Sequence, residues 1–139
     1  MMKIFRTMED GIRQISEIQE GSWVHLSDPT ATELLNISSE YGIDIAHLRA
    51  PLDEEERSRI EVEDDYTLIL VDIPVIEERN DKEWYVTIPL GIILTEKVIF
   101  TVCLEEPPIL NAFMDGRVRN FFTYKKTRYI LQMLYKNAT

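Results

Sequence analysis

Hydrophobic and polar residues change their spacing several times along the chain, and each change predicts a different kind of element. Residues 3–7 form a short extended run. Within residues 12–18 the isoleucines recur at every third position, which fits either a helix or a strand. Residues 22–26 form a β-prone run that ends at Asp28-Pro29, where proline stops a strand. The first 29 residues therefore predict short, mainly extended elements.

A helical pattern follows over residues 30–42. Thr30 and Glu33 have the spacing of a capping box, in which the hydroxyl accepts a hydrogen bond from the third amide and the glutamate reaches back to the cap. The apolar residues then share one helical face, and Gly42 stands where a left-handed C-cap is needed. Residues 43–48 predict a second short helix, which Pro51 is expected to end.

The middle of the chain is β-like. Three runs are rich in β-branched and aromatic residues, namely residues 66–73, 84–94 and 97–104. Apolar stretches without alternation at 68–71 and 91–94 predict strands that are covered on both faces. The short connection at 95–97 predicts a hairpin, and residues 77–83 predict a polar loop.

The helical period returns after Pro107-Pro108, with one helix predicted from residue 109 and an amphipathic helix over residues 124–135. The second of these has no clear stop signal, so we expect it to continue in a longer protein from which this sequence was cut. Helices, a mixed central sheet and further helices at the C-terminus predict one layered α/β/α domain over residues 1–139.

Composition supports a single globular domain, since the 139 residues are 45% apolar and include one cysteine. A lone Cys103 forms no internal disulfide, which favours a reducing compartment and a small buried side chain. His25 is predicted to be a structural or surface histidine. No glycine-rich phosphate loop and no nucleophile in a catalytic context can be written, so we expect no enzyme. The longest nearly apolar stretch, residues 88–94, is far below the roughly 18 residues of a membrane span.

Charge changes this picture, because it is uneven. The net charge is −10, and residues 1–114 hold nine basic against 24 acidic side chains. An acidic body repels phosphates, which argues against nucleic acid as a partner, and it attracts cations. The acid-rich stretch 53–65 offers weak ligands for Mg²⁺, which keeps several waters and uses one or two carboxylates. The alternative is a solvated acidic face in which Arg57 and Arg59 pair locally.

Several segments together resemble the CorA family of magnesium transporters. Three carry the similarity near the N-terminus: Asp28-Pro29-Thr30, Glu33-Leu34 and Tyr41-Gly42-Ile43. Residues 48–66 are similar to the family's "Leu-x-x-x-Gln-Arg-Pro-Lys-Val-Glu…Asp-Tyr" segment, through Glu56-Arg57-Ser58-Arg59-Ile60-Glu61 and Asp65-Tyr66. The resemblance covers residues 20–139.

The resemblance implies the N-terminal cytoplasmic domain of a transporter that lies in the cell membrane. In that family the domain is followed by a very long helix and two membrane spans, with a Gly-Met-Asn signature at the pore mouth. The family assembles as homopentamers, and divalent ions bound between the cytoplasmic domains help to close the pore. The implied function is regulatory Mg²⁺ sensing, with a weakly bound ion that folding does not require.

One departure from the family pattern affects the implied metal ligands. Many relatives carry Glu-Asp after the leucine that aligns with Leu48, whereas this chain has Arg49 and Ala50, which offer no oxygen ligand. Asp53 can substitute if the segment is helical, since residues three or four apart share a helical face. The predicted Mg²⁺ ligands are therefore Asp53, Glu56 and Asp64.

Three other functions stay open. The chain is consistent with a zinc- or cobalt-transporting relative, because the parts that would decide the ion are absent from it. An independent acidic protein-interaction module needs neither a metal nor a continuation. A small hydrolytic enzyme using Asp/Glu pairs has the least support, since no acid is matched with a convincing base or nucleophile.

Overall fold

The computed structural model describes residues 1–106 and 108–114. In chain order its elements are β1 (Met2–Met8), β2 (Gly11–Ile15), β3 (Trp23–Ser27), α1 (Ala31–Tyr41), α2 (Ile45–Arg49), the 3₁₀ turn η1 (Ala50–Leu52), β4 (Arg59–Val62), β5 (Tyr66–Arg79), β6 (Lys82–Thr95), β7 (Ile99–Cys103) and α3 (Pro108–Met114). The helix predicted over residues 124–135 lies outside the described residues.

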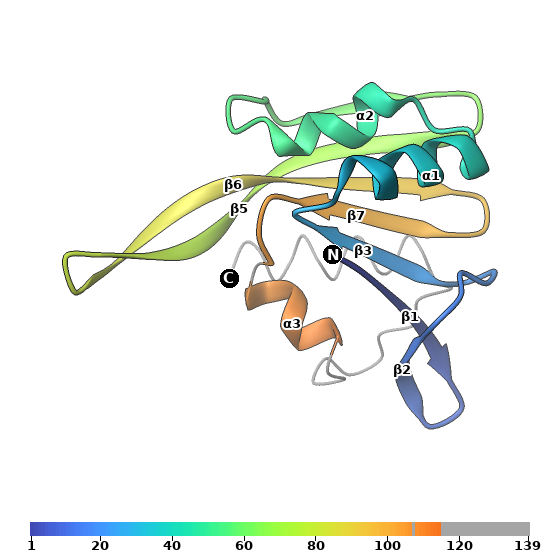
Figure 1. Cartoon of the computed structure of the whole chain (residues 1–139), viewed down its shortest axis with the longest axis horizontal. Coiled ribbons are helices and arrows are strands. Elements are labelled where there is room, and N and C mark those ends of the chain that lie inside the picture. The colour runs from blue at the N-terminus through green and yellow to red at the C-terminus, as the bar shows by residue number, and fades with distance from the viewer. Residues whose placement is uncertain (107, 115–139) are drawn as a thin grey trace.

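The strands form one mixed sheet in the order β2-β1-β3-β7-β6-β5-β4. Strands β3 and β7 are parallel, and every other neighbouring pair is antiparallel. Helices α1 and α2 lie on one side of the sheet and α3 lies on the other (Figure 1). The predicted α/β class with a mixed central sheet is confirmed.

The start and end of α1 follow the predicted capping signals. The Glu33 amide donates to the Thr30 hydroxyl over 3.1 Å, and the Thr30 amide donates to the Glu33 carboxylate over 2.9 Å. Gly42 ends the helix in the left-handed conformation, with φ of 66°. Leu34 and Ile37 face the sheet, so local signals fix both the limits of α1 and its buried face.

Two hydrophobic cores lie on the two faces of the sheet. Ile92 and Ile93 are adjacent in β6 and both are fully buried, but Ile93 belongs to the core under α1 and α2, whereas Ile92 belongs to the core that includes Leu110 and Phe113 of α3. A strand that is covered on both faces loses its apolar-polar alternation. The prediction from the apolar run at 91–94 is confirmed.

The polar loop predicted at residues 77–83 is wrong. Strand β5 continues to Arg79 and β6 begins at Lys82, and only Asn80 and Asp81 connect them. Both turn residues have positive φ, of 52° and 62°, as a tight hairpin between right-twisted strands requires. Figure 1 shows the resulting two-stranded ribbon reaching well beyond the body of the molecule. Its strands carry many charged residues because solvent surrounds them there.

The helix expected to end at Pro51 is α2, which ends at Arg49, and Pro51 lies inside the 3₁₀ turn η1 that follows α2 directly. The proline ring packs against the backbone of Gly91 in β6, where an added Cβ would lie 2.2 Å from Pro51 Cγ. This close approach attaches the α2–η1 segment to the sheet. Asp53 follows in an extended conformation, so the helical placement that was expected to let it replace Arg49 and Ala50 is wrong.

Candidate metal centre

Strand β4, which the sequence did not predict, has an inverted hydrophobic pattern. Ile60 and Val62 are 67% and 76% exposed, whereas Arg59 and Glu61 are half-buried on the opposite face. Register places Glu61 opposite Leu68 of β5, a residue of the core under α1 and α2. Because strand side chains alternate between faces, the acidic residue points toward α2 and the apolar residues point to solvent. Local departures from the expected pattern concentrate at functional sites.

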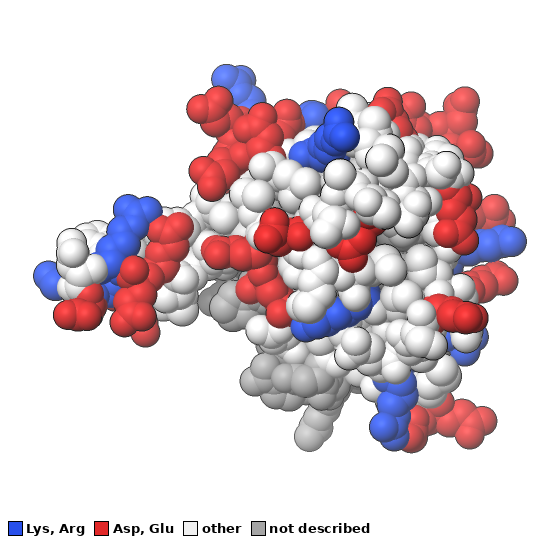
Figure 2. All heavy atoms as spheres, viewed as in Figure 1, with Lys and Arg blue, Asp and Glu red and all other residues white. Residues whose placement is uncertain are grey.

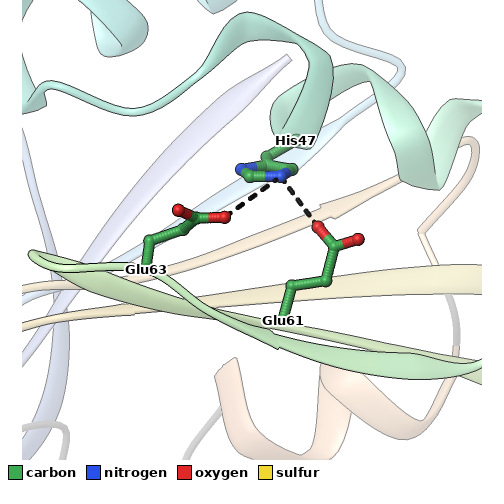
Figure 3. A group of neighbouring side chains, drawn as sticks. All are labelled: His47, Glu61 and Glu63. Carbon is green, nitrogen blue, oxygen red and sulfur yellow. Dashed lines mark ion pairs between the residues drawn. The ribbon is translucent and has the colours of Figure 1, made fainter.

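Helix α2 presents His47 to this acidic face. Asp44 caps the helix by accepting a hydrogen bond from the Ala46 amide over 2.9 Å, and the fully buried Leu48 anchors it to the core. The imidazole Nε2 of His47 lies 2.8 Å from Glu61 Oε2 and 3.8 Å from Glu63 Oε1 (Figure 3). One ligand atom from each of the three side chains lies within 4.8 Å of the others.

The other ring nitrogen of His47 is held by Tyr66, the first residue of β5. The tyrosine hydroxyl lies 2.6 Å from His47 Nδ1 and accepts a hydrogen bond from the Asp44 amide over 3.1 Å. Burial raises the pKa of this hydroxyl, which keeps it protonated at neutral pH. The Nε2 of His47 faces the Glu61 carboxylate, which only accepts hydrogen bonds, so the proton of a neutral ring lies on Nε2 and the Tyr66 hydroxyl donates to Nδ1.

Two surface hollows flank His47. One is lined by the carboxylates of Asp44, Glu63, Asp64 and Asp65 together with His47, and none of the described residues in its lining is Lys or Arg. The other is lined by His47, Asp53, Glu56 and Glu61, together with Arg49 and Arg59. Figure 2 shows acidic side chains gathered along the edge of the molecule that carries α2. The first hollow is thus the more strongly cation-attracting of the two.

The predicted ligands Asp53, Glu56 and Asp64 are not brought together. Asp53 and Glu56 line the hollow with the two arginines, and Asp64 lines the other. Asp53 accepts a hydrogen bond from the Glu55 amide over 3.0 Å, and Glu56 forms an ion pair with Arg59. Local pairing of Arg59, which the sequence offered as the alternative to a metal, is therefore confirmed for Glu56.

Sequence reasoning missed His47, Glu61 and Glu63 as a group. In the part of the chain that the structure describes, they form the one group of three or more His, Cys, Asp or Glu side chains close enough to share an ion. Glu61 and Glu63 are two residues apart, which is the spacing that places both on one face of a strand. That signal was present, but it was hidden in a run of acids that was not predicted to be a strand.

The other histidine lies in a dry environment. His25 in β3 is 1% exposed, and its Nδ1 lies 2.7 Å from the Thr101 hydroxyl, which also accepts a hydrogen bond from Trp23 Nε1 over 2.8 Å. Burial lowers the pKa of His25 to about 4, against the opposing charge of Glu106. Cys103 is buried beside it, and burial raises its pKa to about 12. The predictions of a structural His25 and a buried Cys103 are confirmed.

The fold and the acidic edge define an α/β domain with a cation-attracting surface, and comparison with known proteins identifies its family. The family model of the CorA-like Mg²⁺ transporter protein matches residues 19–136. The chain belongs to this family. None of the helices among the described residues combines the length and the apolar character that a membrane crossing needs.

Relatives agree with the family assignment. The cobalt/magnesium transport protein CorA of Methanocaldococcus jannaschii is 28% identical over 110 residues, which are 79% of this chain and 32% of that protein. The solved soluble domain of CorA from M. jannaschii matches with a TM-score of 0.75 at 22% identity, over 98% of this chain and 55% of that one. The ZntB cytoplasmic domain from Vibrio parahaemolyticus shares the fold, with a TM-score of 0.68 at 11% identity over 97% of this chain and 57% of that one. The chain therefore spans about a third of the curated relative.

Proposed function

We propose that this chain is the cytoplasmic regulatory domain of a divalent-cation transporter, and that it senses Mg²⁺. The observation that carries the proposal is the family match over residues 19–136. The curated relative of which this chain spans a third is named a cobalt/magnesium transport protein, which supports transport as the activity of the whole protein. The chain's own contribution is regulatory rather than enzymatic.

The acidic hollow beside His47 supports Mg²⁺ as the sensed ion. Mg²⁺ keeps most of its water shell and needs only one or two carboxylates, so an open hollow suits it better than a closed cage. Asp64 lies there with Asp44, Glu63 and Asp65, and among the residues that the structure describes no arginine in the lining opposes the ion. Of the three predicted ligands, Asp64 is therefore the one that we propose makes the larger contribution, while Arg49 and Arg59 reduce the attraction at Asp53 and Glu56.

The proposed mechanism is electrostatic. In a homopentamer, acidic surfaces of neighbouring copies face one another and repel, and bound Mg²⁺ screens the repulsion. Loss of the ion then shifts the assembly toward a more open arrangement, because a ligand shifts an equilibrium by its differential affinity for the two states. The net charge of −10 supports a strong dependence on cations.

A second candidate is a transporter for a transition metal, such as cobalt or zinc. The specific observation that favours it is a histidine nitrogen among the carboxylates at the edge of the domain, since imidazole suits Zn²⁺ and its neighbours in the periodic table better than Mg²⁺. Mg²⁺ stays the first proposal because the family model carries that ion in its description.

Isothermal titration of the 139-residue chain with MgCl₂ tests the sensing proposal. We expect Asp64→Asn to weaken Mg²⁺ binding roughly fivefold, the equivalent of about 1 kcal/mol for one carboxylate charge near the ion in water. Asp53→Ala is expected to have a smaller effect, because two arginines already line that hollow.

Glu78→Gln is the matched control, since Glu78 is exposed on the β5–β6 ribbon away from both hollows. It is expected to leave the Mg²⁺ heats unchanged. If Asp64→Asn and Asp53→Ala give the same heats as the unmodified chain, these residues are not the Mg²⁺ ligands. If the unmodified chain gives no heat with Mg²⁺, this domain does not sense the ion.

A further inference from the structure

We propose that His47, Glu61 and Glu63 form a binding site within one chain for a borderline transition-metal ion such as Co²⁺. Its ligand set differs from that of the hydrated Mg²⁺ proposed at Asp64, although His47 and Glu63 also line the hollow that holds Asp64. A regulatory role for it rests on the proposed function, but the binding itself does not. The histidine gives this part of the acidic surface a selectivity for transition-metal ions that carboxylates alone do not have.

The spacing of the three ligand atoms fits a small metal ion. A metal bonded at about 2.0–2.2 Å to nitrogen and oxygen holds tetrahedral neighbours about 3.3–3.6 Å apart. The distances from His47 Nε2 to the two carboxylates are 2.8 and 3.8 Å, and no pair in the group exceeds 4.8 Å. The observed spacings lie on either side of that range, which is compatible with one shared ion after adjustment of the side chains.

The backbone already positions the ligands on two elements. Glu61 and Glu63 project from one face of β4 and the residue after it, and the Glu63 amide donates to the Tyr66 carbonyl over 2.9 Å, which fixes the turn between β4 and β5. His47 projects from α2, which Pro51 attaches to Gly91 of the sheet. Figure 3 shows the imidazole lying between the two carboxylates, which rise toward it from the sheet.

The Tyr66 hydroxyl supplies the support that a ligating histidine usually has. Metal-bound histidines hydrogen-bond through the second ring nitrogen, which fixes the ring orientation and the tautomer. When a metal takes Nε2, the ring proton lies on Nδ1 and is donated to the Tyr66 oxygen, 2.6 Å away. That oxygen has two lone pairs, so it can accept from Nδ1 and from the Asp44 amide at the same time.

The donor set selects the class of ion. One imidazole nitrogen and two carboxylates suit Co²⁺, Ni²⁺ and Zn²⁺, whereas Mg²⁺ takes oxygen ligands and dehydrates reluctantly. The side chains of His47, Glu61 and Glu63 are 15%, 36% and 46% exposed, so an ion can reach the group from solvent. Two carboxylate charges balance the charge of a divalent ion, which makes the complex electrically neutral.

Within residues 1–106 and 108–114, Arg59 is the one Lys or Arg that contacts this group, and its position is compatible with a metal. Its Nε donates to Glu61 Oε1 over 3.1 Å, whereas Oε2 is the oxygen that faces His47. The arginine also pairs with Glu56. It therefore orients the Glu61 carboxylate. The oxygen Oε2, which we propose binds the metal, is left facing His47 Nε2.

Titration of the 139-residue chain with CoCl₂ tests the site, followed by calorimetry and by the visible absorption of protein-bound Co²⁺. We expect Co²⁺ to bind about tenfold or more tightly than Mg²⁺. The variant His47→Gln is expected to weaken Co²⁺ binding by about tenfold or more and to lose the absorption band. Glu78→Gln, on the exposed β5–β6 ribbon, is the control for the loss of one carboxylate, and it is expected to retain the absorption band.

Glu63→Gln gives a second variant in case His47→Gln does not fold, because the Glu63 side chain is 46% exposed and its removal leaves the α2 packing intact. Binding of Co²⁺ by His47→Gln and Glu63→Gln with the affinity and spectrum of the unmodified chain would overturn the proposal, as would Co²⁺ binding no tighter than Mg²⁺. Titration with Mg²⁺ distinguishes the two proposals, because Asp64→Asn should alter the Mg²⁺ heats but not the Co²⁺ spectrum. An unmodified chain that binds Co²⁺ but not Mg²⁺ would refute Mg²⁺ sensing and would still support the Co²⁺ site.

Discussion

His25 and His47 have the same hydrogen bond on one ring nitrogen and opposite surroundings on the other. In each, Nδ1 lies against a hydroxyl, Thr101 at 2.7 Å and Tyr66 at 2.6 Å. The Nε2 of His25 then faces Cys103 Sγ at 3.9 Å, whereas the Nε2 of His47 faces the carboxylates of Glu61 and Glu63. His25 is 1% exposed, and the side chain of His47 is 15% exposed.

This difference shows that the second ring nitrogen and its access to water decide what an oriented imidazole can do. A thiol in a dry core neither carries charge nor admits a hydrated ion, because burial raises the Cys103 pKa to about 12. His25 is therefore held neutral as a structural hydrogen-bonding group. Carboxylates at the rim of the sheet make His47 part of the group that we propose as a cation-binding site instead.

The largest effect that separates the two histidines is a pH dependence of stability that originates at His25. Burial lowers its pKa from 6.5 to about 4, an effect that outweighs the opposing charge of Glu106 and that Lys3 and the N-terminal amine reinforce. The unfolded chain therefore binds a proton that the folded chain does not, and stability falls as the pH drops from about 6.5 to about 4. The loss reaches about 3 kcal/mol, at about 1.4 kcal/mol per pKa unit.

Urea unfolding of the unmodified chain and of His25→Asn at a series of pH values measures this contribution. Asparagine keeps an acceptor near the Thr101 hydroxyl and never gains a charge in this range. At neutral pH the variant is less stable, because it packs less well, and the gap should narrow by up to about 3 kcal/mol toward pH 4. A gap that stays constant across that range would show that the buried imidazole does not control the acid sensitivity.

The sequence predicts the parts of this fold that local chemistry encodes. The capping box at Thr30 and the left-handed Gly42 set the limits of α1, and the hairpin at residues 95–97 joins β6 to β7. The ribbon was missed because its outer half is surrounded by solvent, so its residues lack an apolar face. Strand β4 was missed because tertiary pairing with β5, rather than its own pattern, holds it in the sheet.

The candidate site was predictable only in its chemistry. Carboxylates in the stretch 53–65 were expected to attract a cation, and Glu61 and Glu63 lie in that stretch. Their partner His47 is separated from Glu61 by the α2–η1 segment and a turn, and only the packing of α2 over the sheet brings the two together. Spatial neighbours of this kind leave no spacing signature in the sequence.

The buried hydroxyl beside His25 is expected to have an intermediate effect on stability. Thr101→Val has nearly the same volume but removes the oxygen that pairs with both Trp23 Nε1 and His25 Nδ1. Losing these two hydrogen bonds in a dry core should lower the free energy of unfolding by about 1–3 kcal/mol in urea titrations at neutral pH. Thr87→Val, at an exposed position of β6, is the control and should change stability by no more than about 0.5 kcal/mol. Equal effects of the two variants would contradict a structural role for the hydrogen bonds.

The smallest effect on stability, and the one that sharpens the contrast most, is expected from Tyr66→Phe. The ring of Tyr66 stays packed in the core, but the hydroxyl that orients His47 is lost, which should lower the free energy of unfolding by about 1 kcal/mol. Loss of this support should also weaken Co²⁺ binding about tenfold, as removal of an outer-shell partner commonly does. Because the three proposed ligands remain, the visible spectrum of bound Co²⁺ should persist at saturating metal. The control is Thr101→Val, which removes the equivalent hydroxyl beside His25 and should leave Co²⁺ affinity unchanged. If both variants lose Co²⁺ affinity to a similar extent, general destabilisation rather than the orientation of His47 lowers the affinity.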